Sequence, residues 1–171
     1  MDPLVLVLRF VHVVFGALWV GMMTFGTFFL MPAVQEVGPD GGKVMAAIQR
    51  RGLMTFMPIL AIGTLISGIW LYLRASAGMA AEFGRSPTGM AFGLGGLAAL
   101  VAFILGVAVL RPMMMKAMAL GQTAAAAPTP ADRERVMGEA ARLRVRSANV
   151  SRLTAYLLFF AVTAMAVARY L

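Results

Sequence analysis

The stretch Leu4–Val34 reads LVLVLRFVHVVFGALWVGMMTFGTFFLMPAV, and it decides the fold. It is longer than the roughly 20 apolar residues that a helix needs to cross a bilayer. Arg9 and His12 are its only ionisable side chains, and His12 is the only histidine in the chain. Ionisable side chains within a membrane span are rare and mark functional sites by default. The stretch therefore predicts a membrane-spanning helix with a candidate site at His12.

The rest of the chain is just as apolar. Hydrophobic residues make up 61% of it and charged residues 13%, against roughly a quarter charged in soluble domains. Three further apolar runs follow the first, at about 53–73, 89–110 and 153–169. No strand-like alternation occurs, and a chain in lipid must satisfy its backbone hydrogen bonds internally. We therefore predict one all-α domain over residues 1–171, an integral membrane four-helix bundle in contact with the lipid bilayer.

Two segments between the spans favour helix extensions. The segment 43–56, KVMAAIQRRGLMTF, is expected to run straight into the second span. Residues 111–152 predict a helical hairpin that turns at about 124–130, with Asp132 as the cap of its second helix. Apolar residues recur on that helix and should meet methionines of the first; the two sets are Val136, Met137, Ala140 and Leu143, and Met114, Met115 and Met118.

The basic residues predict how the bundle is oriented. Eleven lysines and arginines flank the loops after the first and third spans, and four flank the opposite side. The positive-inside rule places both loops in the cytoplasm and both termini outside. The net charge of +8 also raises the question of nucleic acid, but the charge is spread over membrane-flanking positions without a binding motif. A nucleic-acid partner is therefore not expected.

One face of the first span carries the candidate site. Arg9, His12, Gly16 and Trp19 follow one another at intervals of three and four residues, which places them on one side of a helix. A porphyrin beside a helix needs an axial donor and a small residue one turn away, and His12 with Gly16 offers both. Arg9 would pair with a propionate. The alternative is that His12 is a packing residue that hydrogen-bonds to a neighbouring helix.

The residue inventory limits the cofactors. The chain has no cysteine, which excludes thiolate metal sites and covalently attached haem. With one histidine, a haem b would need a methionine, a water, an open position or the His12 of a second copy as its other axial ligand. Zinc is a poor fit for the same reason. Fifteen methionines keep copper open as a less favoured cofactor, with the densest cluster at Met113, Met114, Met115 and Met118.

Short motifs in the first two spans resemble a known family. The pattern His-x-x-x-Gly-x-x-Trp-x-Gly, formed by His12, Gly16, Trp19 and Gly21, resembles that of the CopD/HemJ-like group of small four-helix bacterial inner-membrane proteins. The resemblance implies that His12 corresponds to a haem-binding histidine and that any enzymatic activity is that of a haem-linked oxidoreductase. The lysine expected at the start of the third helix is absent from 86–96, SPTGMAFGLGG, so protoporphyrinogen oxidase activity is not expected.

Three function classes remain open at this stage. All seven acidic residues lie outside the spans, which argues against buried carboxylate chemistry and proton relays. The first class is haem or porphyrin binding for electron transfer or haem handling, as a monomer or a homodimer. The second is an accessory or scaffold subunit that packs against a larger membrane complex through its glycine-rich third helix. The third is copper transport through the methionines.

Overall fold

Four long helical rods make up the protein. The computed structural model describes residues 2–171, except for the side chain of Pro39, and no strand occurs among these residues. All four rods are long and apolar enough to cross a membrane, which confirms the predicted all-α four-helix membrane bundle. The first rod contains α1 (Pro3–Phe25), η1 (Gly26–Leu30) and α2 (Met31–Glu36); the second is α4 (Leu53–Ala75); the third contains α6 (Pro87–Ile104), η3 (Leu105–Leu110) and α7 (Arg111–Ala125); the fourth is α8 (Pro130–Ala168).

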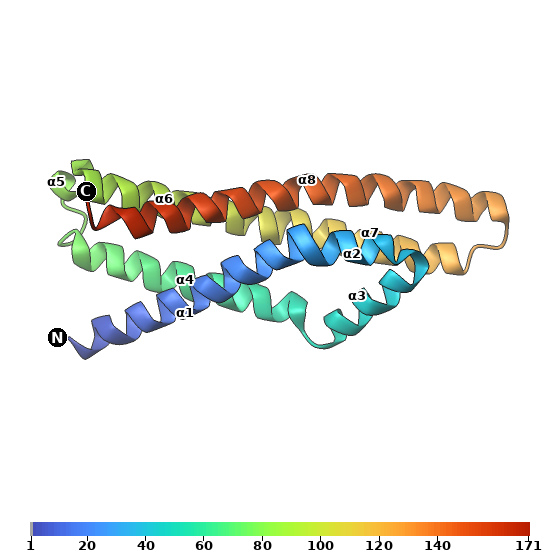
Figure 1. The fold of residues 1–171 in the computed structure, drawn as a ribbon, viewed down its shortest axis with the longest axis horizontal. Coiled ribbons are helices and arrows are strands. Elements are labelled where there is room, and N and C mark those ends of the chain that lie inside the picture. The colour runs from blue at the N-terminus through green and yellow to red at the C-terminus, as the bar shows by residue number, and fades with distance from the viewer. Residues whose placement is uncertain (1) are drawn as a thin grey trace.

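The bundle has two different ends (Figure 1). Asp2, Leu171 and the connection between α4 and α6, which includes α5 (Ala81–Arg85), lie at one end, called the terminal end below. The opposite end, called the hairpin end, holds η2 (Gly38–Asp40), α3 (Gly41–Arg50) and the turn from α7 into α8. Both termini therefore lie at the same end, as four crossings require.

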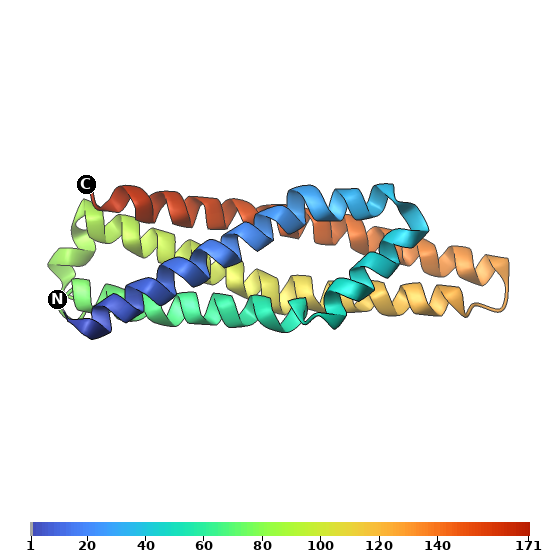
Figure 2. The same ribbon diagram turned by 60° about the horizontal axis from the view of Figure 1, so that its bottom comes forward.

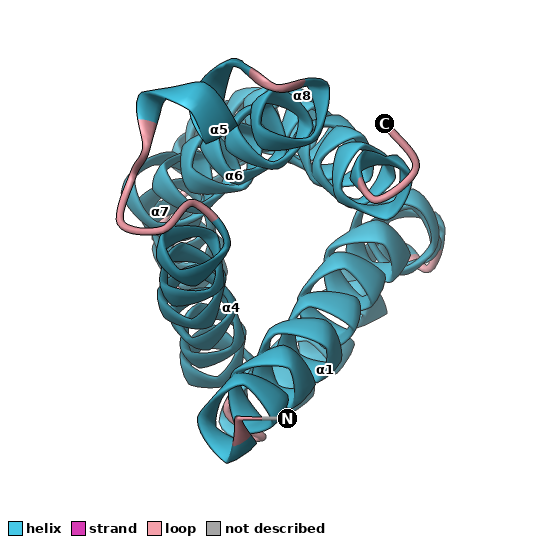
Figure 3. Ribbon diagram, turned by 90° about the vertical axis from the view of Figure 1, so that its left-hand side faces the viewer, coloured by secondary structure: helices cyan, strands magenta, loops and turns pink. Residues whose placement is uncertain are grey.

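The rods associate as two pairs. Helix α1 lies mainly against α4, whereas α6 and α7 lie mainly against α8. Viewed along the bundle axis, the four rods form a ring (Figure 3). One buried cluster joins the two pairs at mid-height and includes residues from every rod: Trp19 from α1, Leu60 and Ala61 from α4, Ala98, Ala99 and Ala102 from α6, and Leu158 and Ala161 from α8.

Helix α1 crosses the bundle diagonally (Figure 2). At the terminal end Asp2 binds Arg74 of α4, with 3.2 Å between Oδ2 and Nη1. Towards the hairpin end the first rod meets α8, because the hydroxyls of Thr27 in η1 and of Ser151 are hydrogen-bonded at 2.7 Å. The rings of Phe28 and Tyr156 lie 6.0 Å apart just beside that bond. The first rod thus connects both pairs.

Two of the rods contain a wide, π-helical turn at a corresponding place. The amide of Met31 donates to the carbonyl of Gly26, and the amide of Arg111 donates to that of Gly106, both five residues back. A proline follows each amide, at Pro32 and Pro112. Proline lacks an N–H and its ring collides with the carbonyl four residues back, which is a known cause of such turns.

Small residues let α6 approach α8 closely. Gly95, Ala99 and Ala102 are buried, and a Cβ at Gly95 would lie 3.1 Å from the carbonyl oxygen of Ala161. The predicted small-residue face of the third span therefore packs against α8 of the same chain. Gly106 does not belong to this contact, because no atom lies within 4 Å of the Cβ it lacks.

The structure corrects two details of the predicted extensions. The segment 43–56 does not form one helix with the second span, because α3 ends at Arg50 and Gly52 adopts a left-handed backbone with φ of 86° before α4 begins. The cap of α8 is Thr129, whose hydroxyl accepts the amide of Asp132 at 3.1 Å, and not Asp132 itself.

Helices α7 and α8 pack against each other as a hairpin, and fewer of the predicted contact residues are buried between them than expected. Val136 and Ala140 are buried, whereas Met115 and Met137 are exposed. An ion pair between Lys116 of α7 and Glu139 of α8, at 2.8 Å, links the two helices from their outer sides.

Candidate functional site

His12 lies between α1 and α4, in the half of the bundle near the terminal end. Its Nδ1 is 2.9 Å from the carbonyl oxygen of Thr64. The ring covers Gly68, since a Cβ at that glycine would lie 2.7 Å from Cε1 of His12 and 3.0 Å from Nδ1. The side chain is half-buried. The imidazole is therefore held by a hydrogen bond on one side and by a close glycine contact on another.

The hydrogen bond fixes the role of each ring nitrogen. A carbonyl oxygen can only accept, so Nδ1 of His12 must carry the hydrogen and donate it to Thr64. In the neutral ring the lone pair then belongs to Nε2. Metal-bound histidines have the same arrangement, in which one nitrogen binds the metal and the other donates to a backbone carbonyl. The donor pattern therefore suits a single bond from Nε2 to a metal.

A short polar network holds the accepting carbonyl. The hydroxyl of Ser67 also donates to the carbonyl oxygen of Thr64, at 3.1 Å, and to that of Gly63 at 2.6 Å. The Thr64 hydroxyl donates to the carbonyl of Leu60 at 2.7 Å. Thr64 and Ser67 are 7% and 2% exposed, so the network is shielded from its surroundings. Its members are hydroxyls and carbonyls of α4, without a charged group.

Glycines of α4 determine how closely α1 can approach. Gly63 accommodates the ring of Phe15 and Gly68 that of His12, because a Cβ at either position would lie closer than 3.0 Å to the aromatic carbons. Such close approach through small residues is the usual means by which membrane helices associate. His12 thus meets the backbone of α4 directly.

Gly16 and Trp19, two of the predicted site residues, lie in packing positions. A Cβ at Gly16 would be 3.4 Å from the methyl group of Thr64, so this glycine faces the same α4 residue as His12. Trp19 is 5% exposed and belongs to the buried cluster that joins the four rods. The two residues place α1 against the bundle one and two turns from His12.

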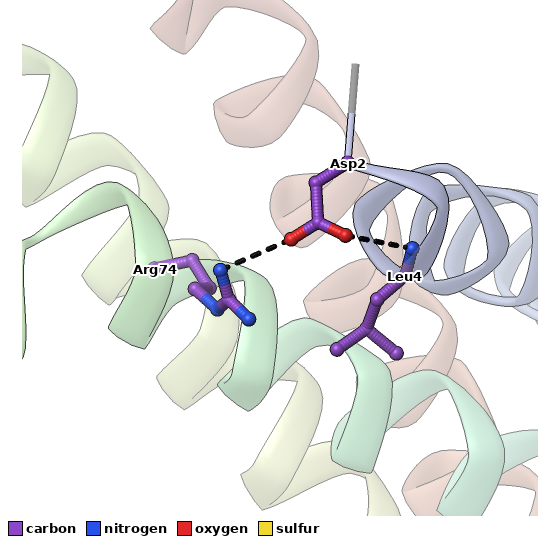
Figure 4. Close-up of polar contacts among 3 residues, drawn as sticks. All are labelled: Asp2, Leu4 and Arg74. Carbon is purple, nitrogen blue, oxygen red and sulfur yellow. Dashed lines mark hydrogen bonds and ion pairs between the residues drawn. The ribbon is translucent and has the colours of Figure 1, made fainter.

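Arg9, the fourth predicted residue, lies at the terminal end. It is exposed and lines a shallow hollow of about 270 Å³ together with Asp2, Val5 and Leu6. The carboxylate of Asp2 caps α1 by accepting the amide of Leu4 and also binds Arg74 (Figure 4). None of the ion pairs in the described part of the chain includes Arg9. Its guanidinium is thus available to an anionic group one turn from His12.

The surroundings of His12 provide few other ligands. Within residues 2–171, no group of three or more histidine, cysteine or acidic side chains could hold a metal ion. The polar partners of His12 come from α4, and no sequence pattern predicted them. Thr64 and Gly68 stand out in an apolar run as small residues four apart, but their pairing with His12 depends on the register between two helices.

The methionine cluster proposed for copper lies elsewhere, on α7. Met113, Met114 and Met118 are half-buried against the hairpin, and Met115 is 58% exposed. Half-buried methionines between two helices have the ordinary role of flexible apolar filling.

Comparison with known proteins adds no relative. The sequence matches no protein-family model, and neither a curated protein nor a solved structure is significantly similar to it.

Proposed function

We propose that this chain is a multi-pass bacterial inner-membrane protein that binds a b-type haem or a related porphyrin through Nε2 of His12. Its role would be electron transfer or haem handling. The observation that carries the proposal is the hydrogen bond from Nδ1 of His12 to the carbonyl of Thr64, which leaves the other nitrogen as the electron-pair donor. The resemblance of the His12, Gly16, Trp19 and Gly21 pattern to the CopD/HemJ-like group supports the same ligand.

The residues present fit one side of a haem. His12 would hold the iron through its free ring nitrogen, and Arg9, one turn nearer the terminal end, would provide a cation for a propionate. Bound iron would supply one-electron chemistry. The protein's own part would be to orient the imidazole through Thr64 and to hold the porphyrin carboxylates close to the membrane surface.

The proposed topology places the hairpin end in the cytoplasm and both termini in the periplasm. The support is the bias of lysine and arginine, of which eleven flank the hairpin-end loops and four the terminal end. His12 would then lie in the periplasmic half of the membrane.

An absorption spectrum tests the ligand. The purified protein, titrated with haemin, should develop a Soret band, and His12→Asn should abolish it. Asparagine is the informative substitution because its amide nitrogen can replace Nδ1 as the donor to Thr64, whereas nothing replaces Nε2. His12→Ala, which loses both, should also be colourless and in addition less stable.

Circular dichroism and thermal unfolding show whether His12→Asn remains folded. A folded His12→Asn variant that keeps the wild-type band would refute ligation by His12. A wild-type protein that takes up no haem and copurifies with other membrane subunits would refute the cofactor and favour the scaffold alternative. Metal uptake that survives His12→Asn but falls on substitution of the Met113–Met118 cluster would favour copper transport instead.

Haem stoichiometry tests the proposed homodimer. Two copies that share one haem through their His12 side chains should bind one haem per two chains and give a low-spin spectrum. One haem per chain, with a high-spin spectrum, would instead indicate a water or an open position opposite His12.

A further inference from the structure

Arg152 on α8 lies further from the hairpin end than the last apolar residues of the first and third rods. Its neighbour Ser151 is bonded to Thr27, and the apolar part of the first rod continues to Val34, seven residues nearer the hairpin end. At 1.5 Å per helical residue, this is about 10 Å. Arg152 therefore lies about two helical turns further from the hairpin end than Val34, the last apolar residue of the first rod.

The packing of α6 gives the same depth independently. Gly95 touches the backbone of Ala161, which fixes the register of α6 and α8. From that contact Leu110, the last apolar residue before Arg111, is fifteen residues towards the hairpin end, whereas Arg152 is only nine residues away. The difference of six residues corresponds to about 9 Å. Two different contacts thus place Arg152 about 9–10 Å inside the apolar ends of the first and third rods.

A cation at this depth needs an anion. Arginine stays protonated in proteins, and a charge that faces hydrocarbon is costly unless its head reaches the interface or a partner. Arg152 is exposed, and none of the ion pairs formed by residues 2–171 includes it. Any anion that pairs with Arg152 therefore comes from outside residues 2–171.

Two further hydrogen-bond donors lie on α8 between Arg152 and the hairpin end. Arg146, Asn149 and Arg152 follow at intervals of three residues, and all three are exposed on α8. This spacing keeps them on one broad side of the helix. Leu153 and Tyr156 follow Arg152 along α8 towards the terminal end. Their side chains are 50% and 60% exposed and form an apolar surface next to the three donors.

We propose that Arg146, Asn149 and Arg152 bind the phosphate of an anionic phospholipid in the leaflet at the hairpin end. Two guanidinium groups and an amide are the donors that a phosphodiester accepts best. Its acyl chains lie along Leu153 and Tyr156, whose ring is fixed against Phe28. Free phosphate fits less well, because the deepest donor lies within the apolar layer. This site is independent of His12.

Native mass spectrometry with added phosphatidylglycerol tests the site. Arg152→Gln should lower the retention of one lipid about tenfold, as expected for the loss of hydrogen bonds to a charged group. Arg152→Lys should have an intermediate effect, since lysine keeps the charge but not the bidentate geometry. Arg133→Gln is the matched control: it removes the same charge from the same helix nineteen residues away, about 28 Å, and should leave retention unchanged.

Three outcomes would overturn the proposal. Equal retention by Arg152→Gln and wild type would show that the arginine reaches the interface without a specific lipid. Equal losses in Arg152→Gln and Arg133→Gln would show attraction by net charge alone. Displacement of the lipid by millimolar inorganic phosphate would show an anion site that does not select lipid. If Arg152→Gln does not fold, Asn149→Ala provides the same comparison, with a smaller expected loss.

Discussion

His12 is held by a hydrogen bond to a backbone carbonyl and by close packing over a glycine. Thr64 contributes its carbonyl and Gly68 contributes space, so neither presents a reactive group to the imidazole. This environment orients the ring through one hydrogen bond and one close contact. An orienting carbonyl on one nitrogen is what a metal-binding histidine requires.

Gly68→Ala should displace the imidazole. The new Cβ would lie 2.7 Å from Cε1 of His12, which is too close for either to stay in place. Overpacking of this kind costs about 1–3 kcal/mol. We therefore expect a lower unfolding temperature and, in the haem-loaded protein, a weakened or shifted Soret band.

The matched control for that substitution is Gly96→Ala on α6, where no atom of another residue is found within 4 Å of the added Cβ. It should leave unfolding and spectrum close to wild type. Identical behaviour of Gly68→Ala and Gly96→Ala would show that the ring is not confined by α4 as described.

Sequence patterns predicted His12 as a candidate site residue but did not predict which atoms of α4 it contacts. An isolated histidine in an apolar run indicates a site whatever surrounds it, and the spacing of Arg9, His12, Gly16 and Trp19 predicts one helix face. That Gly16 and His12 both meet Thr64 depends on the crossing of α1 and α4, which neither helix specifies alone.

At the level of the helices, breaks were harder to predict than spans. Apolar length predicts a membrane crossing because the bilayer sets a fixed thickness. A stop such as Gly52 depends on a single left-handed residue among strong helix formers, and the wide turns before Pro32 and Pro112 alter the hydrogen-bond pattern without ending the helix. These local features change the direction of a helix and its register against its neighbours. Amino-acid composition carries no information on either.

Acid should loosen the hairpin of α7 and α8. Lys116 lowers the pKa of Glu139, first through its hydrogen bond to the carboxylate and then through its charge. A carboxyl with a lowered pKa in the folded state contributes stability above its unfolded pKa, and this contribution is lost as the pH falls through the folded value. The effect is small because both side chains are exposed.

Hydrogen exchange measures this change. Amides of α7 and of the first turns of α8 should lose protection as the pH falls from neutral through the lowered pKa of Glu139, after correction for intrinsic rates, while those near the buried cluster should not. Glu139→Gln should remove the pH dependence of the hairpin. Glu134→Gln, a matched change on the same helix without an ion pair to α7, should preserve it; an equal effect of both would exclude the Lys116 contact as its cause.

For the molecule as a whole, cysteine labelling tests the proposed orientation. The chain has no cysteine, so each variant carries a single thiol. Gly84→Cys lies in the connection at the terminal end and Ala126→Cys in the turn at the hairpin end, and both positions are exposed. A membrane-impermeant maleimide should label Gly84→Cys in intact spheroplasts and label Ala126→Cys only after lysis. The reverse pattern would place the hairpin outside.

Overall architecture was predictable as far as hydrophobicity controls it. The number of rods and their antiparallel order follow from four apolar runs with connections between them. The change of partner along the first rod, from Arg74 near one end to Ser151 near the other, follows from side-chain fit between rods and has no signal in the periodicity of any one of them.

The pairing of α1 with α4, and of α6 and α7 with α8, has a consequence for assembly. Each pair is a helical hairpin whose two rods are contiguous in the chain and bury their small residues against each other, so each can insert into a bilayer as a self-contained half. The connection that includes α5 then serves chiefly as a tether. We expect two separately synthesised fragments, divided there, to associate within the membrane through the buried cluster that joins the pairs.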